Sequence, residues 1–286
     1  MNDSEIFIVG ANGQLGTALR TQYPGSQFAD IDEMDVTDSE SVFSFDWSGI
    51  NYVLNAAAYT NVDGAETQEG RISSWKVNAS AVANLAEVCQ MHDMILIHIS
   101  SDYVFDGTIK PHSEDEPFSP LSVYGESKAA GDIAASLTPK HYILRTTWVI
   151  GEGKNFVRTM LDLAARDISP TVVSDQIGRL TFTSELVRAI DHLLRTQAPY
   201  GVYNVTNDGA SASWADIARD IFAIAGRGEL TVADSTTAEY FAGKEGIAPR
   251  PLQSEMDLTK LHGTGFKSRD WHDDLKLYIN KEQTQL

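Results

Sequence analysis

The sequence lacks the features that support a secreted, membrane or disulfide-bonded protein. It contains a single cysteine, Cys89, so no internal disulfide can form. The apolar helical pattern around Cys89 predicts a buried small side chain in a reducing compartment. No apolar run approaches the roughly 18 residues that a membrane span needs, and the few polar residues before Ile6 do not resemble a signal peptide. We therefore expect a soluble, cytoplasmic protein that does not bind membranes.

Basic residues are also scarce. The 286 residues include 22 Lys and Arg against 40 Asp and Glu, which gives a formal net charge of -18. A field of this sign repels nucleic acid and anionic lipid, so neither is an expected partner. An anionic substrate must then be held by locally placed cations or by backbone amides. The hydrophobic fraction of 42% is ordinary for a globular chain with a large core.

The chain begins with a strand, a glycine-rich turn and a helix. Ile6–Val9 is a continuous apolar run, as in a strand buried on both faces, and a helical pattern starts near Thr17. Between them, glycines allow a tight turn and a close approach of the backbone to a pyrophosphate at the helix N-terminus. This order of elements predicts a dinucleotide site. Its expected cofactor contacts are Gly10, Asn12, Gly13, Gln14, Leu15 and Gly16.

Strands and helices then alternate, which predicts an α/β fold with a Rossmann-like, doubly wound parallel sheet. The expected strands are 26–29, 51–58, 94–101 and 142–150, and the expected helices include 73–92 and the one that holds Tyr124. The alternation weakens after residue 150, where turn-rich segments at 174–178, 203–207 and 248–251 separate helices. We therefore expect a dinucleotide-binding domain at 1–150 and a smaller, mainly substrate-binding portion at 151–286, interleaved with the last strands of the sheet.

Ligands of such sheets bind at the carboxyl ends of the strands. Asp30 follows the second strand and is expected to accept the adenosine ribose hydroxyls, although Asp32 is close enough to compete for that role. The small residues after the third strand let the backbone lie against a cofactor. Besides the glycine turn, the expected cofactor contacts are Asp30, Asp35, Val36, Ala57, Ala58, Tyr59, Thr60, Tyr124 and Lys128.

Tyr124 and Lys128 lie four residues apart, hence one turn apart on the same helical face. A free tyrosine has a pKa near 10 and is a poor acid or base at neutral pH. A neighbouring ammonium favours the phenolate, so we expect Lys128 to bring the pKa of Tyr124 toward the operating range. His98, inside an apolar strand, is interpreted as a satisfied core histidine.

Motifs follow one another in a fixed order over roughly residues 6 to 278. They lie at segments 10–16, 55–60 with Val62 and Asp63, 100–107, 124–128, 145–148, 155–160, 175–178 and 250–251. With these motifs the chain resembles the dTDP-4-dehydrorhamnose reductase family of the extended short-chain dehydrogenases/reductases.

The resemblance implies hydride transfer from NADH or NADPH to C4 of a dTDP-linked 4-keto-6-deoxyhexose, giving dTDP-L-rhamnose. Tyr124 would donate a proton to the carbonyl oxygen, Lys128 would lower its pKa and bind the nicotinamide ribose, and Ser101 would hold the same oxygen. Ser101 stands where the family more often has threonine, which keeps the hydroxyl. The implied contacts with the sugar nucleotide are Ser101, Asp102, Tyr103, Trp148, Asn155 and Arg250.

Two features of this chain modify that picture. No Lys, Arg or His lies between Arg20 and Arg71, although an NADPH-specific enzyme normally places a cation there against the 2′-phosphate. We therefore expect NADH to be used at least as well as NADPH. Some relatives bind magnesium at a dimer interface through glutamates, one of them on the first helix. Here that helix reads Thr17-Ala18-Leu19, so we expect no metal and a monomer or weak dimer.

Three other interpretations stay open. A 4-epimerase of the same superfamily is compatible with the Tyr-Lys pair, whereas Tyr103 after Asp102 disfavours a 4,6-dehydratase, which usually has glutamate there. A non-catalytic, NAD(P)-binding regulatory subunit is a third possibility, but it need not keep Ser101, Tyr124 and Lys128 together. The family resemblance also implies association with, or fusion to, the 3,5-epimerase that catalyses the preceding step of dTDP-rhamnose biosynthesis.

Overall fold

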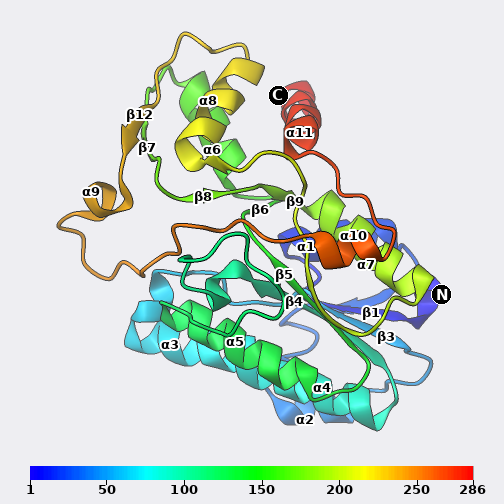
Figure 1. Ribbon diagram of the computed structural model, residues 1–286. Coiled ribbons are helices and arrows are strands. Elements are labelled where there is room, and N and C mark those ends of the chain that lie inside the picture. The colour runs from blue at the N-terminus through cyan, green and yellow to red at the C-terminus, as the bar shows by residue number, and fades with distance from the viewer. Residues whose placement is uncertain (286) are drawn as a thin grey trace.

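The computed structural model describes residues 1–285, which build a central parallel sheet with helices on both faces (Figure 1). The sheet has six strands in the order β10-β5-β4-β3-β1-β2, and every neighbouring pair is parallel. Their bounds are β1 Ile6–Val9, β2 Gln27–Ala29, β3 Tyr52–Asn55, β4 Ile95–Ser101, β5 His141–Thr146 and β10 Gly201–Asn204. This arrangement confirms the predicted Rossmann-like α/β fold.

Strand β1 shows why these segments read as continuous apolar runs. Ile6 and Ile8 pack into one core cluster, whereas Phe7 and Val9 pack into another on the opposite face of the sheet. Because successive side chains of a strand point to opposite faces, a strand covered on both sides needs apolar residues at every position.

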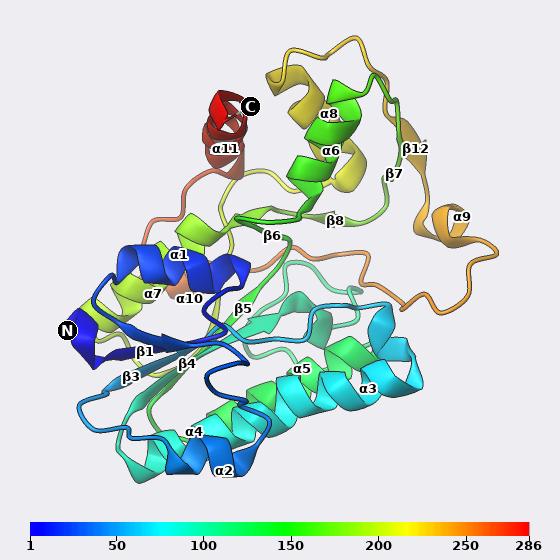
Figure 2. The ribbon, with the colours of Figure 1, turned by 180° about the vertical axis from the view of Figure 1, so that it is seen from behind.

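Helices cover both faces of the sheet (Figures 1 and 2). One face carries α1, α7 and α10, and the other carries α2, α4 and α5, with α3 leading into α4 through a π-helical turn at Lys76–Ser80. Their bounds are α1 Gln14–Gln22, α2 Ser39–Ser44, α3 Gln68–Trp75, α4 Ala81–Met91, α5 Val123–Ser136, α7 Thr183–Thr196 and α10 Thr259–Gly263. The helix expected at 73–92 is thus the second part of a longer helical run.

A second lobe lies beyond α1 and α7, with its own core (Figure 2). Its helices are α6 Phe156–Ala165, α8 Trp214–Ile224, α9 Thr237–Phe241 and α11 Trp271–Gln285. Three short strand pairs join its segments: β6 Val149–Ile150 with β9 Thr181–Phe182, β8 Ile177–Gly178 with β11 Ala212–Ser213, and β7 Thr171–Val173 with β12 Ala233–Ser235. Trp271, Leu275 and Ile279 form the buried side of α11 in this core.

Several expected elements differ from the structure. The strand expected at 51–58 ends at Asn55, and the turn expected at 174–178 contains the short strand β8. The strand expected at 142–150 stops at Thr146, because Trp148 has a φ of +48° and turns the chain out of the sheet. Val149 and Ile150 then pair with β9 in the second lobe. The turn expected at 203–207 is also wrong in part, because Tyr203 and Asn204 belong to edge strand β10. Helix α7 and strand β10 therefore lie with the main sheet although they follow residue 150.

No helix among residues 1–285 is both long enough and apolar enough to cross a membrane.

The core of the second lobe can be tested at α11. Trp271 is fully buried and its indole N–H donates to the Ala210 carbonyl at 2.8 Å. Trp271→Ala should lower the free energy of unfolding by about 3–5 kcal/mol, because it leaves a large cavity. Leu277→Ala on the same helix, at a side chain that is 64% exposed, should cost less than about 0.5 kcal/mol. Equal losses in urea titrations of the two variants would contradict this packing.

Candidate active site

The turn between β1 and α1 is packed so closely that it requires glycine. Gly10 has a φ of +72°, and a Cβ on it would lie 2.5 Å from the Ala57 nitrogen. A Cβ on Gly16 would lie 2.2 Å from the Gly10 carbonyl oxygen. A Cβ on Gly13, in contrast, would meet only the Gly10 oxygen, at 3.4 Å. The outer side of Gly13 is therefore open at the N-terminus of α1, where a pyrophosphate fits the free amides.

A cleft of about 340 Å³ extends from this turn along the ends of β1, β2 and β3. The structure brings together in it most of the residues predicted to bind the cofactor: Gly10, Gly13, Asp30, Asp35, Val36, Ala57, Ala58 and Tyr59. Seven other predicted cofactor contacts do not line the cleft: Asn12, Gln14, Leu15, Gly16, Thr60, Tyr124 and Lys128. Leu15 instead packs in the core against the sheet. The cleft has the position and the small-residue walls of a dinucleotide site.

At the end of the cleft beyond β2, Asp30 and Arg20 both form hydrogen bonds with Asn12 of the glycine turn. One Asp30 carboxylate oxygen accepts the Asn12 N–H at 2.8 Å, which ties β2 to the glycine turn. The Arg20 guanidinium donates to Asn12 Oδ1 at 3.2 Å and lies 4.0 Å over the Phe28 ring. Arg20 is thus held at the edge of the predicted ribose site.

Tyr124 lies in the first turn of α5, which Ser122 caps by accepting the Gly125 N–H. Its ring is buried and packs edge-on against Tyr103, with ring centroids 5.4 Å apart. Burial raises the pKa of Tyr124 to about 12, and the Asp102 carboxylate adds to the rise while the Ser101 hydroxyl opposes it. The expectation that Lys128 brings this pKa down is wrong in this structure, because desolvation of the phenolate dominates. A phenol that keeps its proton at neutral pH is a donor.

Lys128 is buried one turn further along α5. Its ammonium donates to the Ile99 carbonyl at 2.6 Å, which places it against the end of β4. Burial lowers the pKa of Lys128 to about 8, and the nearby Asp132 carboxylate opposes that fall. Lys128 therefore carries its charge at neutral pH but loses it in mildly alkaline solution.

Asp102 and Ser101 form a buried polar pair where β4 ends. The Ser101 hydroxyl donates to one Asp102 carboxylate oxygen at 3.1 Å and accepts the Tyr103 N–H at 3.2 Å. The second Asp102 oxygen accepts the Ser254 hydroxyl at 2.5 Å. Burial raises the pKa of Asp102, which these two hydroxyl contacts partly offset. Ser254 was not predicted, because it is distant in sequence and belongs to no motif.

Ser254 belongs to a segment, 248–257, that crosses the site from the second lobe. Ile177 donates to the Leu252 carbonyl at 2.8 Å and accepts from the Ser254 N–H at 2.7 Å. Arg250 in this segment forms two bonds, of 2.8 and 2.9 Å, to the Asp63 carboxylate. The predicted diphosphate contact of Arg250 stays a prediction, and it requires the anion to share Arg250 with Asp63.

The two other predicted substrate contacts lie in different surroundings. The Trp148 ring stacks on Trp214 at 3.8 Å and lies against Gly178, where an added Cβ would meet both Trp148 and Ser254. Trp148 therefore lies beside segment 248–257, whose Ser254 donates a hydrogen bond to Asp102. Asn155 instead caps α6 by accepting the Arg158 N–H at 3.0 Å, and its amide nitrogen donates to the Gly151 carbonyl and the Tyr278 hydroxyl, both at 2.8 Å.

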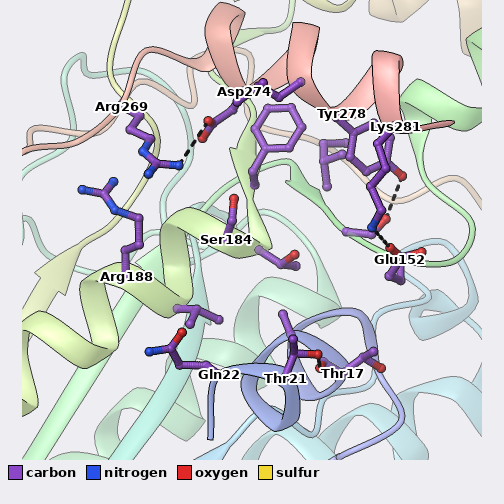
Figure 3. Close-up of a pocket in the computed structure, with 17 residues that line it drawn as sticks. Thr17, Thr21, Gln22, Glu152, Ser184, Arg188, Arg269, Asp274, Tyr278 and Lys281 are labelled. Carbon is purple, nitrogen blue, oxygen red and sulfur yellow. Dashed lines mark hydrogen bonds and ion pairs between the residues drawn. The ribbon is translucent and has the colours of Figure 1, made fainter. Parts of the chain in front are cut away.

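Another cavity, of about 590 Å³, lies elsewhere, between α1, α7 and α11 (Figure 3). Thr17 and Thr21 of α1 line it, as does the Lys281–Glu152 ion pair. No residue predicted to be catalytic lines this cavity. Within residues 1–285, no group of three or more His, Cys, Asp and Glu side chains is placed to hold a metal ion, and the absence of a metal requirement stays a prediction.

Comparison with known proteins decides the family. Residues 4–284 match the family described as RmlD substrate binding domain. The chain belongs to the dTDP-4-dehydrorhamnose reductase family. The reductase of that name from Aggregatibacter actinomycetemcomitans is 37% identical, over 96% of this chain and 97% of the relative.

Solved structures of family members agree with this assignment. The Clostridium acetobutylicum dTDP-4-dehydrorhamnose reductase superposes with a TM-score of 0.89 at 35% identity, covering 97% of this chain and 99% of that one. The Bacillus anthracis enzyme, solved in complex with NADP, gives a TM-score of 0.87 at 32% identity, covering 97% and 98% of the two chains. Membership of this family makes the protein an oxidoreductase that uses a nicotinamide dinucleotide.

The position of Asn155 can be tested directly. Asn155→Ala should lower the free energy of unfolding by about 2 kcal/mol, because it removes a helix cap and leaves the Gly151 carbonyl without one of its donors. Ser213→Ala removes only the matching cap of α8 and should cost about 1 kcal/mol. Unchanged stability of Asn155→Ala, together with a raised KM for the sugar nucleotide, would contradict the structural role.

Proposed function

We propose that this protein reduces dTDP-4-dehydro-L-rhamnose to dTDP-L-rhamnose with Tyr124 as the general acid. The observation that carries the proposal is the buried Tyr124 phenol, which keeps its proton beside the Ser101–Asp102 pair at the carboxyl end of β4. The buried Lys128 lies one helical turn further along α5. Family membership supports the same reaction, because the relatives compared are named as dTDP-4-dehydrorhamnose reductases.

The residues of the site divide the reaction between them. A reduced nicotinamide dinucleotide held in the cleft would supply the hydride that C4 of the sugar receives and would leave as the oxidised form. Tyr124 donates its phenolic proton to the C4 carbonyl oxygen, which becomes the new hydroxyl group. The ammonium of Lys128 stabilises the phenolate that remains, and the Ser101 hydroxyl donates a hydrogen bond to the same oxygen as negative charge develops on it.

The dinucleotide fits the cleft at the glycine turn. The free amides at the start of α1 would hold the pyrophosphate, and Asp30 would accept the ribose hydroxyls. On the substrate side, Asp102 would bind hydroxyl groups of the sugar, and its carboxylate is oriented by the hydrogen bond from Ser254. The Trp148 side chain would pack against the sugar ring. Arg250 would meet the diphosphate, and Tyr103 packs directly against the catalytic tyrosine.

The role of Tyr124 is tested by Tyr124→Phe. Loss of the proton donor should lower kcat for NADH or NADPH oxidation with dTDP-4-dehydro-L-rhamnose by about 10²–10⁴-fold, while dinucleotide binding persists. Tyr142→Phe is the matched control, since that buried tyrosine donates to the Ala198 carbonyl away from the site. It should retain turnover at a cost in stability of about 1 kcal/mol.

A Tyr124→Phe variant as active as the native protein would remove the assigned acid. If the native protein binds dinucleotide but consumes neither cofactor with this substrate, the reductase proposal fails. Assays with epimerase and dehydratase substrates would then separate another sugar-nucleotide enzyme from a binding subunit.

The cofactor preference is a separate proposal. The ribose end of the cleft presents the Asp30 carboxylate, which repels a 2′-phosphate, and the nearby cation Arg20 stacks on Phe28. NADH should therefore be used at least as well as NADPH in kcat/KM at fixed ionic strength. Arg20→Ala should weaken the use of NADPH several-fold and change that of NADH less than about twofold.

Arg166→Ala serves as the charge-matched control, because Arg166 is exposed on α6 and pairs only with Asp162. A large NADPH preference in the native protein would overturn the proposed preference. Use of NADPH that is insensitive to Arg20→Ala would contradict the role of Arg20.

A further inference from the structure

A buried polar chain lies behind Lys128 and is not used in the reaction steps above. Asp132, one turn beyond Lys128 on α5, accepts from Arg145 Nε at 2.9 Å through one carboxylate oxygen. Its other oxygen has no hydrogen-bond partner and lies 3.9 Å from His98 Nε2, which also has none. Lys128, Asp132, Arg145 and His98 are each at most 3% exposed. The interpretation of His98 as a satisfied core residue therefore holds for only one of its ring nitrogens.

The hydrogen bonds of Asn55 fix the state of His98. Asn55 Oδ1 accepts the Ala57 N–H at 3.1 Å, so the Asn55 amide nitrogen faces His98 Nδ1, at 3.2 Å. Because an amide nitrogen can only donate, Nδ1 accepts and the ring hydrogen sits on Nε2. Burial and the Lys128 charge lower the pKa of His98 well below its ordinary value, so the ring is neutral. Its Nε2–H therefore faces the free oxygen of Asp132.

Charge counting shows what Asp132 does. Two buried cations, Lys128 and Arg145, share a single buried carboxylate. Arginine cannot lose its proton in a protein, whereas a buried lysine readily does. Lys128 is therefore the cation of this cluster whose protonation can respond to the negative charge of Asp132, and burial raises the pKa of Asp132 as well.

Other ionisable groups on the elements around α5 are half-buried or exposed, or face other partners. Glu114, in the loop before α5, is half-buried; its carbonyl accepts from Arg145 Nη1 at 3.0 Å and its carboxylate accepts the Asn204 N–H at 3.0 Å. Glu66 accepts the Val123 N–H at the start of the helix, and Asp102 faces Tyr124. The remaining charged groups on the neighbouring helices and on β5 are exposed or half-buried: Glu69, Arg71, Lys76, Glu87 and His141.

We propose that Asp132 is a positioning residue that keeps Lys128 as an ammonium inside the protein, with the neutral His98 directed at its second carboxylate oxygen. The same chain of contacts reaches the cofactor cleft, because Asn55 orients both His98 and the Ala57 amide that lines the cleft. The effect of Asp132 on catalysis rests on the proposed reductase function. Its effect on the charge state of Lys128 is independent of that function.

The test measures the titration of Lys128 directly, by NMR of the whole protein labelled with ¹³Cε-lysine, with the signal assigned by Lys128→Met. Asp132→Asn should lower the pKa of Lys128 by about one unit. Arg145→Met should raise it, because Asp132 then has a single cation to compensate. These opposite directions separate an electrostatic role from general loosening of the fold, and Arg145→Met decides the matter alone if Asp132→Asn does not fold.

Two further variants complete the design. Asp132→Glu keeps the carboxylate and should keep the native titration. Asp274→Asn changes another buried carboxylate, which accepts from Asn207 at 2.8 Å in the second lobe, and should lower stability without moving the Lys128 titration. Lys128 titrating identically in the native protein, Asp132→Asn and Arg145→Met would overturn the proposal.

Enzyme kinetics give the second readout. In the native enzyme, kcat/KM should fall as pH rises through the Lys128 titration, since the phenol of Tyr124 ionises only near pH 12. The alkaline limb should move down by about one pH unit in Asp132→Asn and up in Arg145→Met. Absence of turnover with the NMR shifts present would refute the reductase function alone. Turnover with an unmoved limb and unmoved NMR titrations would refute the role of Asp132 alone.

Discussion

The packing of α5 against the carboxyl end of β4 is the constraint on which the site depends. It removes Tyr124 and Lys128 from water, and desolvation then sets both of their pKa values, upward for the phenol and downward for the ammonium. It also brings the Lys128 ammonium to the Ile99 carbonyl and the Tyr124 ring to Tyr103. The same burial that prepares a neutral acid makes the lysine charge costly, so the site needs a buried counter-charge.

The second lobe completes what the sheet begins. The sheet supplies the glycine turn, Asp30 and the Ser101–Asp102 pair, all at strand ends, as expected for a parallel α/β sheet. The segment 248–257 then returns from the second lobe, and Ser254 fixes the Asp102 carboxylate while Arg250 pairs with Asp63. In the proposed function, a substrate held between these parts would contact residues from both lobes, in keeping with predicted contacts that are scattered along the sequence.

The sequence predicted the parts of the molecule whose causes are local. Strands β1 and β4 read as apolar runs because both faces are covered. Gly10 and Gly16 of the first turn are required by contacts within a few residues or with the adjacent β3 loop. The sequence did not predict Ser254, because its contact with Asp102 spans 152 residues. It also missed edge strand β10, a short strand that begins at Gly201, whose φ is +137°, and is followed by a polar segment. The break at Trp148 was missed as well, because a non-glycine residue adopts a positive φ there. The direction of the Tyr124 pKa shift was missed for the same reason, since burial depends on tertiary packing.

The measurement that tests the central claim most directly follows the hydride to its destination. Reduced dinucleotide carrying deuterium at both C4 positions of the dihydronicotinamide would be incubated with dTDP-4-dehydro-L-rhamnose and the native protein, and the product would be examined by NMR and mass spectrometry. The account predicts dTDP-L-rhamnose with one deuterium at sugar C4. Unlabelled product, or a 4-epimer formed without net consumption of dinucleotide, would contradict it.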